Sequence, residues 1–344
     1  MNPQEQLCPK CGASGKEEKI GIHSRQEKRY RCKVCERTFS ETHGSAYYGL
    51  KKPEVFMVVV TLLAYGCPPK AVEVAYGLSA NTIRDWMQRS GQHCEQVHQA
   101  TVGQEKWDLV HIQADEMKIT TQIGEMWLAM VMMVSTRLWL GGSVSCSRGK
   151  DLIERCLTYA AQVALCRPLL LAVDGLNMYV NAVKKTFRSR LRIGKGGRLK
   201  YVKWTNVIVS QVVKKRNGKR HDIQRVMAVG TEEEAQRLRQ QSLGGTQINT
   251  SFIERLNATF RQRLAYLTRR TRAQLRLPQT LNYAMWLQGC VYNFCTYHRS
   301  LALPFYFTPR RRRWIKRTPA MVADLTDHRW TIHELLAFKV RTET

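Results

Sequence analysis

The stretch Leu169-Leu-Leu-Ala-Val-Asp174-Gly175 decides the fold. Its first five residues are all apolar, which is typical of a short strand buried on both faces of a sheet. Upstream of it, the sequence predicts three further strands, over 109–115, 126–134 and 138–145, and a helix over 150–163. This order of elements predicts an α/β domain in which helices cover a mixed sheet.

Composition divides the 344-residue chain into four zones. They are a cysteine-rich module over 1–45, a helical module over 46–100, the α/β domain over 105–305 and a basic C-terminal segment over 306–344. Within the α/β domain we expect a basic insertion at about 185–245. Two strand patterns, 207–213 and 223–229, lie in this insertion.

The chain is strongly basic. It contains 55 Lys+Arg against 27 Asp+Glu, which gives a formal net charge of +28 at pH 7. An excess of this size predicts a polyanionic partner rather than an ordinary metabolite. Two stretches, 184–220 and 255–317, contain many lysines and arginines and no acidic residue. We expect them to contact a nucleic-acid backbone, and a solvated surface is the alternative.

The cysteines and the N-terminus predict a reduced, cytoplasmic protein. The chain has 11 cysteines, and its first residues are polar and lack the apolar run of a signal peptide. The longest apolar stretch, 55–65, is too short to cross a bilayer. We therefore expect no association with a membrane.

Two Cys-x-x-Cys pairs predict a zinc ribbon. Cys8 and Cys11 form the first pair, and Cys32 and Cys35 form the second, 20 residues further on. Each pair folds into a tight turn that supplies two thiolates, so the two pairs together supply the four ligands of a tetrahedral Zn²⁺. Such a zinc is structural because four thiolates leave no position open for a substrate. The alternatives are unrelated thiols or a redox pair.

A helix-turn-helix is predicted over 70–91. Gly77 suits the left-handed position of the turn, and Ser79 can cap the second helix. The residues expected to pack inward are Val72, Ala75, Leu78, Ile83 and Trp86. Asn81, Thr82 and Arg84 then lie on the exposed face of the second helix, where a DNA major groove can be read. The alternative is a helical hairpin with no role in DNA binding.

Three carboxylates form a candidate metal site. Asp115 ends the first predicted strand and Asp174 ends the apolar one, so both can meet at one edge of the sheet. Glu254 lies near the start of a predicted helix, with Asn257 and Arg261 on the same helical face. Two divalent cations need oxygen ligands of this kind.

Each carboxylate taken alone is more often a surface or capping residue. Asp115 also has a neighbour of the same chemistry, Glu116. Because consecutive side chains of a strand point to opposite faces, we expect only one of these two carboxylates to join the site.

At these residues the chain resembles a known family, the insertion-sequence DDE transposases with an RNase H-like catalytic domain. It is most similar to the insertion-sequence-one type, which carries an N-terminal zinc ribbon and a helix-turn-helix. The resemblance rests on the four ribbon cysteines, Gln113-Ala-Asp-Glu-Met117, Asp174-Gly175, the block 249–261 and Tyr292-Asn-Phe-Cys-Thr-Tyr-His-Arg-Ser300. Arg261 matches the basic residue that members of the family usually carry seven positions after the glutamate. The 80-residue gap from Asp174 to Glu254 is longer than is common in the family.

The resemblance implies a DNA transposase. Asp115, Asp174 and Glu254 would be catalytic and would hold two Mg²⁺ (or Mn²⁺) ions. The partners would be double-stranded DNA, at the terminal inverted repeats and at the target, and further copies of the chain when two ends are paired. The expected DNA contacts are Asn81, Thr82, Arg84, Asn257, Arg261, Arg263 and His298. His298 could instead cap the end of the helix predicted over 278–298. The expected location is the nucleoid of a prokaryotic cell.

Two other functions remain open from the sequence. One is a DNA-binding regulator with a zinc ribbon and a helix-turn-helix but no catalysis. The other is an RNase H-like nuclease that cuts without joining strands. The discriminating feature for the regulator is whether the three carboxylates meet in space.

Overall fold

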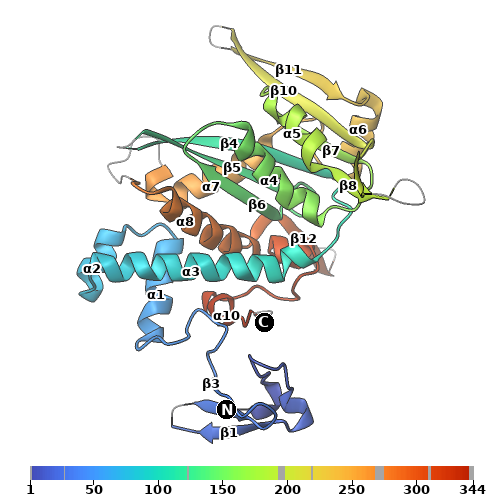
Figure 1. Cartoon of the computed structure of the whole chain (residues 1–344). Helices are drawn as coiled ribbons and strands as arrows, with labels where there is room; N and C mark the ends of the chain where they lie inside the picture. The colour runs from blue at the N-terminus through green and yellow to red at the C-terminus, as the bar shows by residue number, and fades with distance from the viewer. Residues whose placement is uncertain are drawn as a thin grey trace.

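The structure is a computed structural model that describes residues 2–26, 28–121, 124–192, 198–217, 220–267, 275–308 and 311–340. Figure 1 shows a small N-terminal sheet at the bottom, helices in the middle and a large sheet at the top. The small sheet has the order β1-β2-β3 and comprises Ile20–Ser24, Arg29–Cys32 and Thr38–Ser40.

The large sheet has six strands in the order β11-β10-β7-β4-β5-β6. The strands are β4 (His111–Thr121), β5 (Gly124–Met133), β6 (Trp139–Ser145), β7 (Leu169–Asp174), β10 (Val207–Asn217) and β11 (Arg220–Val229). Strands β4, β5 and β6 form an antiparallel meander, whereas β7 pairs in parallel with both β4 and β10. The predicted mixed sheet with covering helices is therefore confirmed.

The apolar stretch 169–173 lies in the middle of this sheet. Leu169, Leu171 and Val173 face the main core, while Leu170 and Ala172 pack on the other face against α6 (Glu232–Gln241). Because both faces are covered, every position of the strand is apolar until its last residue, Asp174.

Helices cover both faces of the sheet. Helices α4 (Lys150–Val163) and α5 (Met178–Thr186) lie on one face, and α7 (Ser251–Arg263) and α8 (Pro278–Cys290) lie with α6 on the other. Two consecutive glycines of β6 allow this close approach. A Cβ on Gly141 would lie 2.5 Å from the Tyr159 side chain of α4, and one on Gly142 would lie 2.8 Å from the Met285 side chain of α8.

The predicted helix-turn-helix is formed by α2 (Pro69–Tyr76) and α3 (Ala80–Ala100), preceded by α1 (Pro53–Ala64). Gly77 adopts the left-handed conformation at φ 60°, and the Ser79 side chain accepts a hydrogen bond from the Thr82 backbone N–H. The expectation for one residue was wrong: Ala75 is exposed.

Helix α3 is also longer than predicted. Its second half lies along α8 (Figure 1), where a Cβ on Gly91 would come within 2.5 Å of the Tyr283 backbone. Cys94, Val97 and His98 are buried in this contact. The burial of polar His98, whose Nε2 lies 3.0 Å from the Leu140 carbonyl oxygen, hid the apolar pattern of this half.

The expected basic insertion needs a correction. Strand β10 pairs with β7 from Val207 to Val212, so the strand pair β10–β11 belongs to the main sheet rather than to a separate insertion. Only the hairpin of β8 (Arg188–Leu191) and β9 (Lys200–Lys203) forms a sheet of its own. The pairing of β10 with β7 joins segments far apart in sequence, which local patterns do not reveal.

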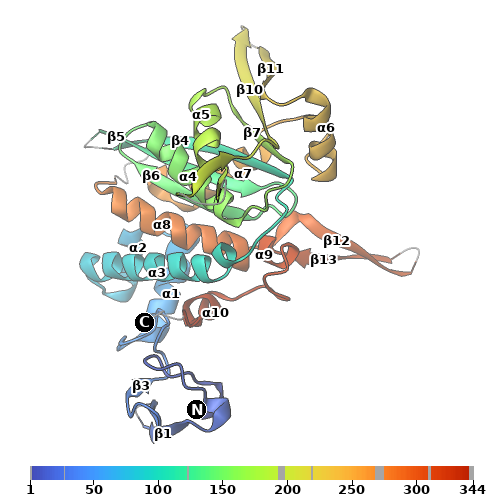
Figure 2. The ribbon, with the colours of Figure 1, turned by 45° about the vertical axis from the view of Figure 1, so that its right-hand side comes forward.

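The helix predicted over 278–298 is also shorter. Helix α8 ends at Cys290, a π-helical turn covers Val291–Cys295, and His298 begins β12 (His298–Thr308). His298 therefore does not cap a helix. Strand β12 pairs with β13 (Arg311–Arg317), and Figure 2 shows this hairpin projecting from the molecule. The domain boundary expected at 305 falls inside β12.

The C-terminal segment returns toward the N-terminal module. It contains the short helices α9 (Pro319–Val322) and α10 (Ile332–Ala337), and α10 packs on α1 and α3. Lys339 Nζ donates to Gln6 Oε1 at 2.7 Å, and the Val340 N–H donates to the Gly44 carbonyl. Of the arginine run 310–313, Arg310 lies outside the described residues. None of the described helices is both long enough and apolar enough to cross a membrane.

Candidate functional site

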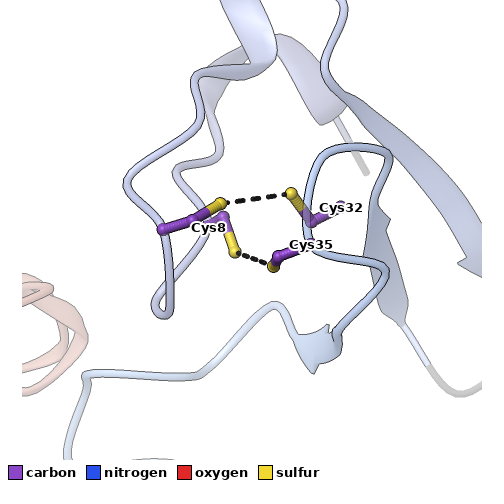
Figure 3. A group of neighbouring side chains, drawn as sticks. Cys8, Cys32 and Cys35 are labelled. Carbon is purple, nitrogen blue, oxygen red and sulfur yellow. Dashed lines mark hydrogen bonds between the residues drawn. The ribbon is translucent and has the colours of Figure 1, made fainter.

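The four cysteines of the N-terminal module lie together. The Cys8 and Cys35 sulfur atoms are 3.4 Å apart, and those of Cys11 and Cys32 are 3.6 Å apart. Figure 3 shows the side chains of Cys8, Cys32 and Cys35 turned toward one another. Two tight turns place them: the Gly12 N–H donates to the Cys8 carbonyl, and the Cys32 N–H donates to the Arg37 carbonyl. All four cysteines are free thiols.

This cluster could hold a zinc ion. All four sulfur atoms lie within 4.8 Å of one another, and a tetrahedral Zn²⁺ with Zn–S bonds of about 2.3 Å requires sulfur atoms about 3.8 Å apart. Burial raises the pKa of Cys32, but backbone N–H groups of Cys35 and Val34 outweigh it and lower that pKa to about 7. The surrounding apolar core contains little besides Ile20, Tyr30 and Phe39.

A second cluster lies where the parallel pairing of β4 with β7 ends. The last paired residues of β4 and β7 are Gln113 and Ala172. Asp115 and Asp174 each follow two residues later. Asp174 ends β7, whereas β4 continues to Thr121, so the expectation that Asp115 ends its strand was wrong. Asp174 also accepts a hydrogen bond from the Leu176 N–H at 3.0 Å, which turns the chain away from the sheet.

Gln113 attaches helix α7 to this edge. Its side-chain Oε1 accepts hydrogen bonds from the backbone N–H groups of Phe252 and Ile253 at 3.1 and 3.0 Å. Its Nε2 donates to the Asn249 carbonyl at 2.6 Å. Gln113 is fully buried, and these bonds satisfy N–H groups that the first turn of a helix leaves unpaired. The start of α7 is thereby fixed beside β4.

Helix α7 brings Asn257 into contact with Asp115, whereas Glu254 lines the same cavity without joining the tight group of Asp115, Glu116 and Asp174. Asn257 Nδ2 donates to Asp115 Oδ2 at 2.7 Å. Glu254 accepts hydrogen bonds from Thr250 Oγ1, at 2.6 Å, and from Lys214 Nζ of β10. The residues lining one cavity of about 740 Å³ include Asp115, Asp174, Glu254, Asn257, Arg261, Arg148 and Lys214.

The expectation that Glu116 is excluded from the site was wrong. One carboxylate oxygen each of Asp115, Glu116 and Asp174 lies within 4.8 Å of the others. Glu116 does point to the opposite face from Asp115, since Tyr179 of α5 donates to it at 2.8 Å. The pairing of β4 with β7 has already ended at this point, so on the β7 side no strand separates the two faces, although β5 still pairs with β4 on the other side.

These carboxylates could bind a metal. Side-chain cations of the protein itself occupy their neighbourhood: Arg148 contacts both Glu116 and Asp174, and Lys214 contacts Glu254. In addition, Asn257 Oδ1 is buried without a hydrogen-bond partner among the described residues. Carboxylate and amide oxygens are ligands suited to Mg²⁺ or Mn²⁺, so the residues present fit the divalent ions expected from the sequence.

The electrostatics of the cluster favour an added cation. Burial raises the pKa of Asp115 to about 7, with further contributions from the nearby charges of Glu116, Asp174 and Glu254. Burial and Glu116 also raise the pKa of Asp174, although Arg148 opposes this shift. A divalent ion would relieve the repulsion among these groups.

The remaining predicted DNA-contact residues lie in two other places. Asn81 and Arg84 are exposed near the start of α3, with half-buried Thr82 between them. Arg263 and His298 line a different pocket, on the far side of α7 from the carboxylates. Sequence reasoning assigned no role to Gln113, Arg148 or Lys214. Only Gln113 carried a signal, because it lies two residues before Asp115 on the same face of its strand.

Compared with known proteins, the sequence matches no model of a protein family, and no curated protein matches it significantly.

Removal of zinc should unfold the N-terminal module alone. Because its core is small, we expect metal binding to supply most of its folding free energy. We expect a strong chelator, or Cys32→Ser, to make residues before about position 45 sensitive to protease while the six-stranded sheet stays resistant. Cys146→Ser, at an exposed cysteine outside the cluster, is the control. Unchanged protease resistance of the chelated module would refute a structural zinc.

Asp115→Asn should stabilise the zinc-loaded protein at pH 8 when no other divalent ion is present. The pKa of Asp115 rises from 3.8 to about 7 on folding, so between these pH values the folded state keeps a proton that the unfolded chain has lost. Stability therefore falls as the pH rises through this window, and the substitution removes that loss. Thermal unfolding should show a higher midpoint than wild type at pH 8 and little difference near pH 4. A variant that is less stable than wild type at pH 8 would contradict the repulsion described here.

Proposed function

We propose that this protein is a DNA transposase that cuts DNA at the ends of an insertion sequence and joins the resulting 3′-OH to a target strand. The observation that carries the proposal is that Asp115, Asp174 and Glu254 line one cavity. These residues come from two strands and a helix that are distant in sequence. A regulator without catalysis gives no reason for three carboxylates to line one cavity, with Asp115 and Asp174 half-buried at a cost in stability.

The architecture supports the same proposal. A mixed sheet flanked by helices is what the resemblance to RNase H-like transposases implies, and the two aspartates lie on adjacent parallel strands of such a sheet, two residues beyond their last pairing. The four-cysteine cluster and the α2–α3 pair precede this domain in the order expected for the insertion-sequence-one type.

Different residues of the cavity would bind the metal ions, position a ligand and contact a phosphate. When bound, two Mg²⁺ ions would activate the attacking water or 3′-OH and stabilise the leaving oxygen. Asp115 and Asp174 would hold these ions, and Glu254 would complete the ligand set. Asn257 keeps the Asp115 carboxylate in position through its 2.7 Å hydrogen bond. Arg261, one turn beyond Asn257, brings a guanidinium to the cavity that suits a phosphate.

DNA recognition is assigned to the N-terminal modules. Asn81 and Arg84 are exposed on the first turns of α3, as a recognition helix requires. The chain's net charge of +28 attracts the DNA backbone whatever the base sequence of the DNA. Pairing of the two ends of one element would bring further copies of the chain together.

Asp174→Asn should abolish cleavage and leave DNA binding intact. The substrate is labelled duplex DNA from the regions that flank the coding sequence, incubated with Mg²⁺ or Mn²⁺, and joining to a supercoiled plasmid is scored in the same reaction. Loss of one carboxylate removes a ligand of the proposed ions, whereas the N-terminal DNA contacts are untouched. Asp108→Asn, at an ion pair with Arg167 away from the cavity, is the matched control and should cleave normally.

Cleavage by Asp174→Asn at the wild-type rate would refute the catalytic assignment. Cleavage by the wild-type protein without any joined product would instead favour a nuclease of the same fold.

A further inference from the structure

Two different faces of helix α7 line two different pockets. Glu254, Asn257 and Arg261 face the carboxylate cavity, whereas Arg255, Thr259 and Arg263 face a separate pocket of about 470 Å³. The two sets alternate at helical spacing, so they lie on different sides of one helix. The pocket is closed on its other sides by residues that include Tyr65, Arg137, Tyr292, His298 and Arg299.

This pocket gathers positive charge without compensation. Four arginines line it, namely Arg137, Arg255, Arg263 and Arg299, and no acidic residue does. None of these arginines forms an ion pair with an acidic group in the part of the chain that the structure describes. Four like charges around one hollow repel one another unless an anion joins them.

Several polar atoms in the pocket also lack a hydrogen-bond partner. Arg137 Nε and Nη1 and His298 Nε2 are buried with no partner among the described residues. The Arg137 guanidinium packs on the Phe252 ring at 3.7 Å, and Arg263 donates to Thr296 Oγ1 at 3.2 Å, so both groups are held in place. A buried donor left unpaired is costly, and an incoming acceptor would satisfy it.

Burial and the neighbouring positive charges also shift the pKa values of these groups. Burial lowers the pKa of Arg137 to about 10, and the nearby Arg255 lowers it further. Burial also lowers the pKa of His298 to about 4, with Arg263, Arg137 and Arg255 adding to the shift. His298 is therefore neutral at pH 7, and one of its ring nitrogens can donate a hydrogen bond, whereas the arginines remain charged.

We propose that this pocket binds one phosphate group of a nucleic-acid backbone. A phosphate offers several oxygen acceptors to guanidinium groups arriving from different directions, which is the arrangement that Arg137, Arg255 and Arg263 provide. The net charge of the chain favours a nucleic acid as the source of this phosphate. An α-helix with its side chains is about 10 Å across, so one DNA strand can reach both faces of α7.

The proposal deepens the proposed function, since it assigns a second contact for the DNA that the carboxylates would cut. The pocket would hold the strand next to the cavity and set where along its backbone the scissile phosphate falls. Arg263 and His298, predicted as DNA contacts, would act here and not at the metal site.

The test measures binding, with no cleavage required. Labelled duplex DNA is titrated with the full, zinc-loaded chain by fluorescence anisotropy at several salt concentrations, with no Mg²⁺ or Mn²⁺ added. We expect Arg137→Gln to weaken binding about tenfold, as loss of a hydrogen bond to a charged group does. The slope of log Kd against log salt concentration should fall by about one, as expected for the loss of one phosphate contact. The exposed Arg255→Gln should act in the same direction and is available if Arg137→Gln fails to fold.

Arg167→Gln, at an exposed arginine paired with Asp108, is the matched control and should bind almost as wild type. In a second arm, inorganic phosphate is added at constant ionic strength and thermal stabilisation is followed. Loss of both DNA affinity and phosphate stabilisation in the pocket variants supports the proposal. If the variants lose phosphate stabilisation but keep their DNA affinity, the pocket takes free phosphate. If neither property changes, the pocket binds no phosphate. Both results overturn the proposal. Because no strand needs to be cut, a failure of the catalytic assignment would leave this result readable.

Discussion

The side chain of Gln113 joins two parts of the chain that are more than a hundred residues apart. It accepts hydrogen bonds from the N–H groups of Phe252 and Ile253 and donates to the Asn249 carbonyl. Strand β4 thereby fixes the start of α7, and from that start follow the positions of Glu254, Asn257 and every later residue of the helix. A fully buried side-chain amide whose oxygen and nitrogen are both hydrogen-bonded holds the elements that it joins rigidly together. Here it joins strand β4, which carries Asp115, to the helix that carries Glu254.

Charge is distributed with opposite sign on the two sides of that helix. On one side, burial and neighbouring carboxylates raise the pKa of Asp115 and Asp174, and Arg148 and Lys214 pair with carboxylates of the same cavity. On the other side arginines surround a pocket without any acidic partner. Both arrangements are unfavourable in the protein alone, and each would be relieved by a ligand of opposite charge. Perturbed charges of this kind concentrate at functional sites.

The sequence predicted the parts of the site that depend on local pattern. The apolar run before Asp174 marked a central strand, and the Cys-x-x-Cys spacing predicted the cluster of four sulfurs. Features set by long-range packing were missed: the pairing of β10 with β7, and the burial of His98 that extends α3. The error over Glu116 came from applying strand alternation past the point where β4 loses its pairing with β7. Arg148 lies in a loop, and nothing local indicates that it reaches Glu116 and Asp174.

The central claim is that the aspartates of β4 and β7 and the glutamate of α7 hold a pair of divalent ions. Anomalous scattering from crystals soaked in Mn²⁺ tests this most directly, because it locates each ion against its ligands. The account predicts two peaks in the cavity, with Asp115 and Asp174 in contact with the ions and Glu254 a ligand of one of them. An empty cavity, with metal found only at the four cysteines, would contradict it.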